Sequence, residues 1–334
     1  MNQKNERRIN WGILGAGNIS GTFANALNGL ENANLYAVAA RQMESAEAFA
    51  KKYSVQKAYD SYETLVQDPE VDVVYIGTIH TMHFELMKLC ILHKKAVLCE
   101  KPFTLNTKET DEIIHLAREH QVFVMEAMWT KFLPTTNKVK EWLQSGRIGE
   151  IKNIRADFGF RIDFDPEHRV FSKEKAGGAL LDVGIYPLTY ACYLMDQLPN
   201  QVTSSVICAK TGVDEMNTML LHFEPNVLAN LSSATTAEIG TTALIAGTKG
   251  VIKVPDFYGA SEAYLVNQEG EVIEHYEHPH IVNGYEYEAE AVMKDLIFGK
   301  TENDIHSLED TRNIIQLMDE FRSEWKIEYP SEMK

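Results

Sequence analysis

The chain has few cysteines, few basic residues and no long apolar run. The four cysteines, Cys90, Cys99, Cys192 and Cys208, have no paired spacing. This scatter argues against a disulfide framework, and thiols in apolar runs are typical of the reduced core of a cytosolic protein. No apolar stretch approaches the length of a membrane span, and the polar N-terminal residues do not lead into the apolar region of a signal peptide. We therefore expect a cytoplasmic protein.

Positive charge is scarce relative to negative charge. The sequence has 48 acidic and 32 basic residues and a net charge of -16. Such a chain repels phosphate backbones, so we expect no nucleic-acid partner, and without a membrane span we expect no membrane partner. Hydrophobic content of 45% and charged content of 24% are ordinary for a globular protein. The 334 residues suffice for two domains, each with its own core.

A glycine-rich turn follows the first predicted strand. Residues 9–14 are apolar and run into Gly15-Ala16-Gly17-Asn18-Ile19-Ser20, which opens a helical pattern. Gly15 permits a tight turn, Gly17 lets the backbone approach a pyrophosphate, and the helix N-terminus supplies amide hydrogens to the phosphates. Because residues 35–40 form a second apolar strand, this order predicts a dinucleotide-binding site. A purely structural turn is the alternative.

The second predicted strand ends at Arg41. An acidic residue at this position accepts hydrogen bonds from the adenosine ribose hydroxyls of NAD, whereas an arginine pairs with the 2′-phosphate of NADP. We therefore predict NADP as the cofactor, with NAD possible. An arginine that only ends the strand is the alternative.

Strand and helix patterns alternate up to residue 128. Further strands are expected at 71–76, 96–99 and 122–127, and helices at 45–53, 61–66, 84–93 and 108–120. This alternation with short connections predicts an α/β fold with a doubly wound parallel sheet, the Rossmann architecture. We assign residues 1–128 to an NAD(P)-binding Rossmann domain. Residues 129–334 then form an α+β domain for substrate binding and dimerisation.

The predicted second domain has more strands than helices to cover them. Strands are expected at 151–160, 201–209, 218–223, 229–235, 241–246 and 251–254, and helices at 137–144, 180–194, 284–298 and 308–321. This pattern predicts a large mixed sheet with one open face. Our hypothesis is that the open face is buried in a homodimer.

The predicted strand at 96–99 ends abruptly at Glu100-Lys101-Pro102. Proline pushes the residue before it into an extended conformation, so Lys101 leaves the strand end without entering a helix. Ligands of open parallel sheets gather outside the carboxyl ends of the strands, so we expect this lysine to reach the ligand crevice. A solvated surface lysine is the alternative.

The loop after the strand at 71–76 contains Thr78, His80 and His83. It leaves the sheet at the same edge as Lys101, so its histidines are expected to contact cofactor or substrate, or to cap a helix. Two histidines three apart could also ligate a metal, but no carboxylate or cysteine nearby completes a set. A second histidine-rich run at 275–280 is polar, contains a proline and is more typical of a surface loop. We predict no metal site.

A second cluster of reactive residues consists of Asp182 and Tyr186, which are bordered by glycines. Residues four apart share one face of a helix, and the glycines let backbone or ligand come close. A phenol with its free pKa of about 10 is a poor base, but a neighbouring ammonium stabilises the phenolate. If Tyr186 faces Lys101, it can take a hydroxyl proton while hydride leaves the same carbon. A buried tyrosine with one hydrogen bond is the alternative.

Together these motifs resemble the glucose-fructose oxidoreductase and inositol dehydrogenase (Gfo/Idh/MocA) family. The glycine turn at Gly15, the strand end at Lys101 and the stretch from Gly177 to Tyr186 occur in the order and at the spacing of that family. The resemblance spans nearly the whole chain. It is closest to the branch that contains dimeric dihydrodiol dehydrogenases and NADP-dependent D-xylose dehydrogenases.

The resemblance implies roles for individual residues. Lys101 and Tyr186 are implied as the catalytic pair, supported by Asp182, and a cis bond is implied before Pro102. Implied substrate contacts are Trp129, Phe158, Asp182 and Tyr186, and predicted cofactor contacts are Gly15, Gly17, Asn18, Ile19, Arg41, Thr78, His80, His83, Glu100 and Lys101.

The resemblance also implies an activity. It is that of an NADP-dependent oxidoreductase that transfers hydride between nicotinamide and a hydroxyl carbon of a sugar or cyclic diol. D-xylose or D-glucose 1-dehydrogenase and trans-dihydrodiol dehydrogenase are the types of enzyme implied. The alternative is a non-catalytic NAD(P)-binding sensor or partner protein, which would need only the glycine turn.

Overall fold

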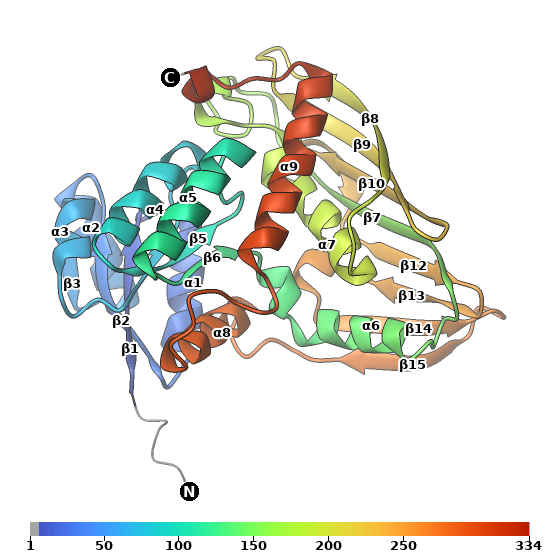
Figure 1. Cartoon of the computed structure of the whole chain (residues 1–334), viewed down its shortest axis with the longest axis horizontal. Helices are drawn as coiled ribbons and strands as arrows, with labels where there is room; N and C mark the ends of the chain where they lie inside the picture. Colours follow the sequence, from blue (N-terminus) through green and yellow to red (C-terminus); the bar gives the residue numbers. More distant parts are fainter. Residues whose placement is uncertain (1–6, 334) are drawn as a thin grey trace, which may run out of the picture. The chain divides into compact units, whose positions relative to one another are not determined.

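The computed structural model describes residues 7–333 and divides into two compact units (Figure 1). The first unit comprises Met1–Trp129 and His280–Arg312, and the second comprises Thr130–Pro279 and Asn313–Lys334. Residues 1–6 lie outside the described part of the chain, and with them most of the segment in which we predicted no signal peptide.

The first unit is built on a six-stranded sheet whose order is β3-β2-β1-β4-β5-β6. The strands are β1 (Ile9–Leu14), β2 (Ala33–Ala39), β3 (Lys57–Tyr59), β4 (Val73–Ile76), β5 (Ala96–Glu100) and β6 (Val124–Ala127). Every pairing is parallel. The winding reverses between β1 and β4, and such sheets bind ligands outside the strand ends at that point. The predicted Rossmann architecture is confirmed.

Helices cover both faces of this sheet. They include α1 (Asn18–Asn28), α2 (Met43–Tyr53), α3 (Tyr62–Gln67), α4 (His83–Leu92) and α5 (Thr107–His120). One face packs on α3, α4 and α5 in a core cluster that contains Leu65, Ile91 and Ile113. On the other face Phe23 of α1 stacks on Tyr75 of β4, with ring centroids 3.9 Å apart. Burial on both faces explains the continuous apolar runs of the strands.

A late segment of the chain returns to the first unit. The sequence-based division assigned all of 129–334 to the second domain, but the structure groups residues 280–312, with helix α8 (Glu286–Ile297), with the Rossmann sheet. Helix α8 packs against α1 and buries side chains such as Ala289 and Val292. An amphipathic pattern shows that a helix packs on a core but does not show which core.

The second unit is built on a nine-stranded sheet with the order β15-β14-β13-β12-β7-β10-β9-β8, and β11 pairs with β7. The strands are β7 (Ile151–Arg161), β8 (Gln201–Cys208), β9 (Asp214–Phe223), β10 (Val227–Ala234), β11 (Thr236–Gly240), β12 (Ala243–Gly247), β13 (Gly250–Val254), β14 (Glu262–Asn267) and β15 (Val272–Glu277). β7 and β10 are parallel, and the other pairs are antiparallel. The predicted mixed sheet is confirmed.

The two faces of this sheet differ in burial. A row of paired residues, Leu265, Ile252, Ile245, Ile154, Ala229 and Leu221, is fully buried on the side of α6 (Pro134–Gln144) and α7 (Ile185–Met195). The neighbouring row points the other way and consists of Tyr264, Lys253, Leu244, Arg155, Asn230 and Leu220, none of them buried. We call the side that bears this second row the open face.

The segment around the histidine-rich run differs from the prediction. Residues 275–277 lie in the edge strand β15, not in a surface loop. His275 stacks on Tyr264, with centroids 4.4 Å apart, and its Nε2 is 3.0 Å from a carboxylate oxygen of Glu262. The strand was missed because Val272 and Ile273 are both more than half exposed, so no alternation of apolar and polar residues marks it.

The remaining helix is α9 (Leu308–Trp325), which begins in the first unit and ends in the second. No helix in the described part of the chain is long and apolar enough to cross a membrane. All four cysteines are reduced thiols, and three of them are buried. This agrees with the reduced core cysteines that were predicted.

Candidate active site

The turn between β1 and α1 has the geometry of a dinucleotide-binding loop. Gly15 has a φ of +98°, and a Cβ on it would lie 3.0 Å from the carbonyl oxygen of Gly77, so glycine is required there. A Cβ on Gly17 would meet that same oxygen at 3.9 Å, and no closer described atom. The space beside Gly17 is what the approach of a pyrophosphate requires.

Helix α1 presents amide groups at this turn. Asn18 is exposed and Ile19 is half-buried, and no side chain among the described residues caps the helix. The first N–H groups of a helix have no partner within it and carry the positive end of its dipole. Ser20 replaces the third glycine of the motif, is buried and donates to the Gly77 carbonyl over 3.4 Å. These groups fit the phosphates of a dinucleotide.

Arg41 lies two residues past the end of β2 and is exposed. Its charge reaches the phenol of Tyr62, where burial raises the pKa and Arg41 partly offsets that rise. The guanidinium therefore lies at the carboxyl edge of the sheet, on the strand that carries the ribose-binding residue in Rossmann folds.

The loop after β4 supplies an unsatisfied polar atom next to the glycine turn. The Thr78 hydroxyl is buried and has no hydrogen-bond partner among the described residues. Its methyl carbon lies 3.0 Å from the position that a Cβ on Gly15 would take. Buried hydroxyl groups without a partner are rare, so this position fits contact with a bound group. His80 is half-buried, with its ring 6.0 Å from that of His83.

His83 is fully buried between two loops of the first unit. Its Nδ1 lies 2.9 Å from the carbonyl oxygen of Pro102, and its Nε2 lies 3.3 Å from that of Thr78. Burial lowers the pKa of His83, so a neutral imidazole donates to one of these carbonyls. The ring thereby joins the Thr78 loop to the loop after β5. Its direct contact with the cofactor stays a prediction.

Strand β5 ends at two ionisable residues. Glu100 is buried and accepts hydrogen bonds from the Tyr75 hydroxyl at 2.6 Å and from the Lys101 amide at 3.2 Å. Burial raises the pKa of Glu100, while the Lys101 ammonium and both hydrogen bonds act against that rise. Lys101 is half-buried, and the bond to Pro102 is cis as the resemblance implied. Lys101 thus lies at the strand end, as predicted.

Trp129, a predicted substrate contact, stacks on an aromatic residue that the sequence analysis missed. Its ring centroid is 4.3 Å from that of Tyr285, and the planes differ by 12°. Gly284 has a φ of +97°, and a Cβ on it would come within 2.6 Å of the Trp129 ring. Both residues belong to the first unit. No sequence pattern connects them, because they lie far apart along the chain, and the sequence analysis had assigned both to the second domain.

In the second unit, Asp182 is bound by an arginine that the sequence analysis also missed. Arg169 donates from Nη1 and Nη2 to the two carboxylate oxygens over 2.9 and 3.1 Å. The Asp182 side chain is 7% exposed and that of Arg169 is 51% exposed. The paired contacts fix the plane of the carboxylate. Arg169 lies in an irregular segment between β7 and the helix, where no periodicity marks it.

Tyr186 lies in a cluster of aromatic rings. Its centroid is 5.4 Å from that of Phe158 and 5.9 Å from that of Tyr258, and Phe158 stacks on Tyr258 at 4.3 Å. Tyr186 is buried, whereas Phe158 and Tyr258 are half-buried. The structure therefore brings together the predicted pair of Phe158 and Tyr186. Tyr258 adds a third ring, on a turn that the sequence analysis did not assign.

Asp182 and Tyr186 lie on a continuous helical segment that begins as a π-helix, Leu180–Gly184, and continues as α7. The sequence predicted one α-helix over 180–194. Asp214 of β9 holds the first turn, because its Oδ2 accepts from the Leu180 amide at 2.7 Å. Burial raises the pKa of Asp214 to about 6. π-helical turns are frequent at functional sites.

No group of three or more metal-ligating side chains was found in the part of the chain that the structure describes. Of the histidines considered as metal ligands, His80 and His83 belong to the first unit. His275 belongs to the second unit, where its Nε2 lies within hydrogen-bond distance of the Glu262 carboxylate.

Two family models match the chain. Residues 9–128 match the model described as "Oxidoreductase family, NAD-binding Rossmann fold", and residues 136–253 match "GFO/IDH/MocA C-terminal domain". The chain belongs to the Gfo/Idh/MocA family. The family resemblance drawn from the motifs at Gly15, Lys101 and Tyr186 is therefore confirmed, and so is an NAD-binding Rossmann domain.

Several relatives that match this Gfo/Idh/MocA protein over nearly its whole length are named as dehydrogenases. The trans-1,2-dihydrobenzene-1,2-diol dehydrogenase of Danio rerio is 40% identical over 330 residues, which cover 96% of this chain and 98% of the relative. The human protein of that name is 33% identical, with coverage of 98% and 99%. The prediction of a dehydrogenase that acts on CH–OH groups is confirmed.

Solved structures show the same fold. KijD10, a 3-ketoreductase from Actinomadura kijaniata in complex with NADP and TDP-benzene, has a TM-score of 0.85 and 22% identity, with coverage of 95% of this chain and 98% of that one. An aldose-aldose oxidoreductase from Caulobacter crescentus complexed with glycerol has a TM-score of 0.86 and 20% identity, with coverage of 96% and 98%.

Proposed function

We propose that this enzyme transfers hydride between NADP and a hydroxyl carbon of a cyclic diol or sugar. The observation that carries the proposal is the aromatic cluster of Phe158, Tyr186 and Tyr258 in the unit that holds Asp182. Flat rings suit the apolar face of a ring-shaped substrate, and the carboxylate suits its hydroxyl groups. Relatives named as dihydrodiol dehydrogenases favour a trans-dihydrodiol over D-xylose or D-glucose.

Lys101 and Tyr186 serve as the catalytic pair in this proposal. When bound, the nicotinamide supplies the hydride acceptor or donor. The Lys101 ammonium stabilises the phenolate form of Tyr186, and this phenolate takes the proton from the hydroxyl group on the substrate carbon that loses hydride, which leaves Tyr186 as a neutral phenol. Asp182, fixed by Arg169, orients the substrate hydroxyl groups, and Trp129 provides a further apolar contact.

NADP is the proposed cofactor, with NAD as a weaker substitute. The support is the exposed guanidinium of Arg41 beyond β2, where the 2′-phosphate of NADP would lie in a Rossmann fold. KijD10, which shares the fold, is a protein in complex with NADP. Gly15, Gly17, Asn18 and Ile19 would bind the pyrophosphate, and Thr78, His80, Glu100 and Lys101 would line the nicotinamide end.

We also propose a homodimer joined through the open face of the nine-stranded sheet. This face bears apolar residues such as Leu220, Leu228 and Leu244 between polar ones, and Leu228 is 39% exposed. A cytoplasmic location is proposed from the four reduced thiols, because a disulfide-forming compartment favours their oxidation. We propose no nucleic-acid or membrane partner.

The proposed activity is tested with a panel of trans-dihydrodiols, pentoses and hexoses. The reaction is followed by nicotinamide absorbance with NADP and, separately, with NAD. We expect turnover of at least one cyclic diol or sugar with NADP. Tight NADPH binding without turnover of any compound in the panel would instead support the non-catalytic sensor.

A further inference from the structure

The first unit contains three buried carboxyl groups around the ends of two adjacent strands. Glu100 belongs to β5, Glu126 to β6 and Glu288 to α8, and they are 5%, 1% and 0% exposed. Glu100 and Glu126 both act electrostatically on Glu288. Three carboxylates in one buried space repel one another, so at least one holds its proton.

Glu100 and Glu126 both accept hydrogen bonds from groups around them. Glu100 accepts from the Tyr75 hydroxyl and the Lys101 amide. One oxygen of Glu126 accepts from the Phe103 amide at 2.9 Å. Its other oxygen lies 2.9 Å from Nε2 of His306 and 3.2 Å from the Thr311 hydroxyl. Hydrogen bonds of this kind stabilise a carboxylate.

Glu288 receives no such support. Neither of its carboxyl oxygens has a hydrogen-bond partner among the described residues, although the side chain is completely buried. Burial, followed by the charges of Glu100 and Glu126, raises the pKa of Glu288 well above its usual range. Helix α1, which packs on α8, contains no titratable side chain that could offset this.

We propose that Glu288 is a positioning residue: it holds the proton of this three-carboxyl cluster, and in its neutral form it lets Glu100 remain ionised beside Lys101. This inference rests on the proposed function, because Lys101 is the residue proposed to serve the reaction. Tyr75 also faces the cluster, and burial keeps it as a neutral donor by raising its pKa well above the usual range. Further titratable groups beside the cluster are His306, His83 and Cys99.

The position of the proton is tested by infrared spectroscopy on the full-length protein at neutral pH, without cofactor or substrate. We expect Glu288→Gln to lose one carbonyl band of a protonated carboxylic acid. Glu100→Gln should keep that band and lose a carboxylate band. Loss of the acid band in Glu100→Gln, or no loss in Glu288→Gln, would place the proton elsewhere and overturn the proposal.

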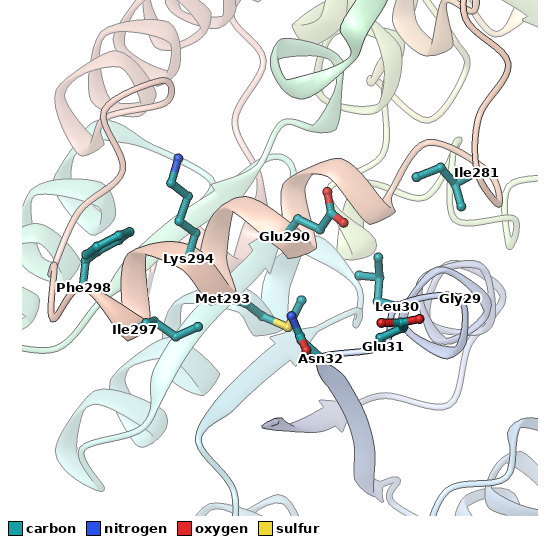
Figure 2. A pocket seen from close by; sticks show the side chains of 10 residues that line it. All are labelled: Gly29, Leu30, Glu31, Asn32, Ile281, Glu290, Met293, Lys294, Ile297 and Phe298. Atoms are coloured by element: carbon teal, nitrogen blue, oxygen red, sulfur yellow. The ribbon is translucent and has the colours of Figure 1, made fainter. Parts of the chain in front are cut away.

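A matched control lies on the same helix. Glu290 is exposed and, with Lys294 and Met293, lines a cavity of about 560 Å³ between α8 and residues 29–32 (Figure 2). We expect Glu290→Gln to retain the acid band, because this side chain lies away from the cluster. Loss of the band in this variant would show that the signal does not report Glu288.

The pH profile of turnover distinguishes positioning from packing. In the wild type, ionisation of Glu288 at alkaline pH would leave three buried carboxylates, and their mutual repulsion would displace Glu100 from its place beside Lys101. We expect Glu288→Gln to shift the alkaline limb of the profile upward by about one pH unit, a typical effect of a neighbouring like charge. Superimposable profiles would exclude the positioning role. The infrared result needs no turnover, so it remains decisive if the proposed activity fails.

Discussion

At the scale of single residues, local partners decide which side chains can act. Asp182 and Tyr186 are both buried, but Asp182 has both oxygens bound by Arg169, whereas Tyr186 is surrounded by rings. A carboxylate held in one plane is suited to orienting hydroxyl groups. A phenol in an apolar setting is suited to proton transfer only when a cation stabilises its anion.

Removal of either member of the proposed catalytic pair should abolish most turnover. We expect Lys101→Met and Tyr186→Phe to lower kcat by about 10²- to 10⁴-fold, the usual contribution of a positioned proton-transfer group. The measurement is steady-state turnover, with NADPH binding by fluorescence to confirm a folded cofactor site.

A matched tyrosine on α7 provides the control. Tyr190 is buried one turn after Tyr186, and its hydroxyl has no hydrogen-bond partner among the described residues. We expect Tyr190→Phe to keep turnover within about twofold, because this change removes no interaction that the reaction uses. Equal losses in the two phenylalanine variants would contradict a catalytic role for Tyr186.

Arg41 should determine the preference between the two cofactors. We expect Arg41→Ser to weaken NADPH binding by about 10- to 100-fold, which corresponds to one charge-assisted hydrogen-bonding partner. NADH binding should change little, because NADH lacks the 2′-phosphate. Dissociation constants for both cofactors provide the measurement, and Lys51→Ser on the exposed side of α2 is the control. An equal loss for both cofactors would refute selectivity through Arg41.

Asp214 should make stability depend on pH. Its pKa is about 6 in the folded protein, against an ordinary value of 3.8, chiefly because the carboxyl is buried. The folded state therefore binds the proton more tightly, and stability is lost as pH rises from about 4 to 6. We expect Asp214→Asn to gain up to about 3 kcal/mol relative to wild type over that interval.

Urea unfolding at pH 4, 5 and 7 measures this effect. The exposed carboxyl of Glu238 provides the control, since Glu238→Gln removes a charge from the same sheet at the surface. A constant difference between Asp214→Asn and wild type across the pH range would contradict the raised pKa.

At the scale of elements, the glycine turn separates the requirements of folding from those of binding. Gly15 needs its positive φ for the turn itself, whereas Gly17 has ordinary backbone angles and only open space beside it. Gly15 is therefore required for the backbone conformation of the turn, whereas Gly17 is required for the approach of the ligand.

Alanine at the two positions should have different effects. We expect Gly15→Ala to cost about 1–3 kcal/mol of stability, because of the strained backbone, and to lose NADPH binding. Gly17→Ala should keep its stability within about 0.5 kcal/mol but lose at least tenfold in NADPH affinity, because a methyl group blocks the pyrophosphate. Thermal unfolding and NADPH titration test both. Retained affinity in Gly17→Ala would exclude pyrophosphate contact at Gly17.

Elements differ in how far the sequence predicts them. The parallel strands of the first unit were found because burial on both faces makes them apolar throughout. β15 was missed, since it is an exposed edge strand with polar residues on both sides. β3, β11 and β14 were also not predicted. The π-helix was predicted as α-helix, because a single wider turn hardly changes the apolar pattern.

At the scale of the whole molecule, the open face of the nine-stranded sheet is the proposed dimer interface. We expect wild type to be a dimer and Leu228→Glu to be a monomer, because paired carboxylates would be buried across the interface. Light scattering coupled to gel filtration provides the measurement. Leu198→Glu is the control, since Leu198 is 44% exposed and lies outside the sheet strands. A dimer that survives Leu228→Glu would place the interface elsewhere.

The sequence by itself determined what depends on neighbours along the chain. The order strand, glycine turn, helix and strand, the strand end at Lys101 and the helical spacing of Asp182 and Tyr186 are local patterns with local physical causes. They were sufficient for the Rossmann fold, for the family and for the choice of Lys101, Asp182 and Tyr186 as candidate residues.

Only the tertiary structure decided which distant groups meet. In the structure α8 belongs to the first unit, Arg169 binds Asp182, and Tyr258 stacks on Phe158. Glu288 shows the limit most clearly, since its place four residues before Val292 puts it on the apolar side of α8. That spacing predicts burial, but not that two other carboxyl groups share the space. Electrostatic coupling depends on distance in space, and chain separation does not determine that distance.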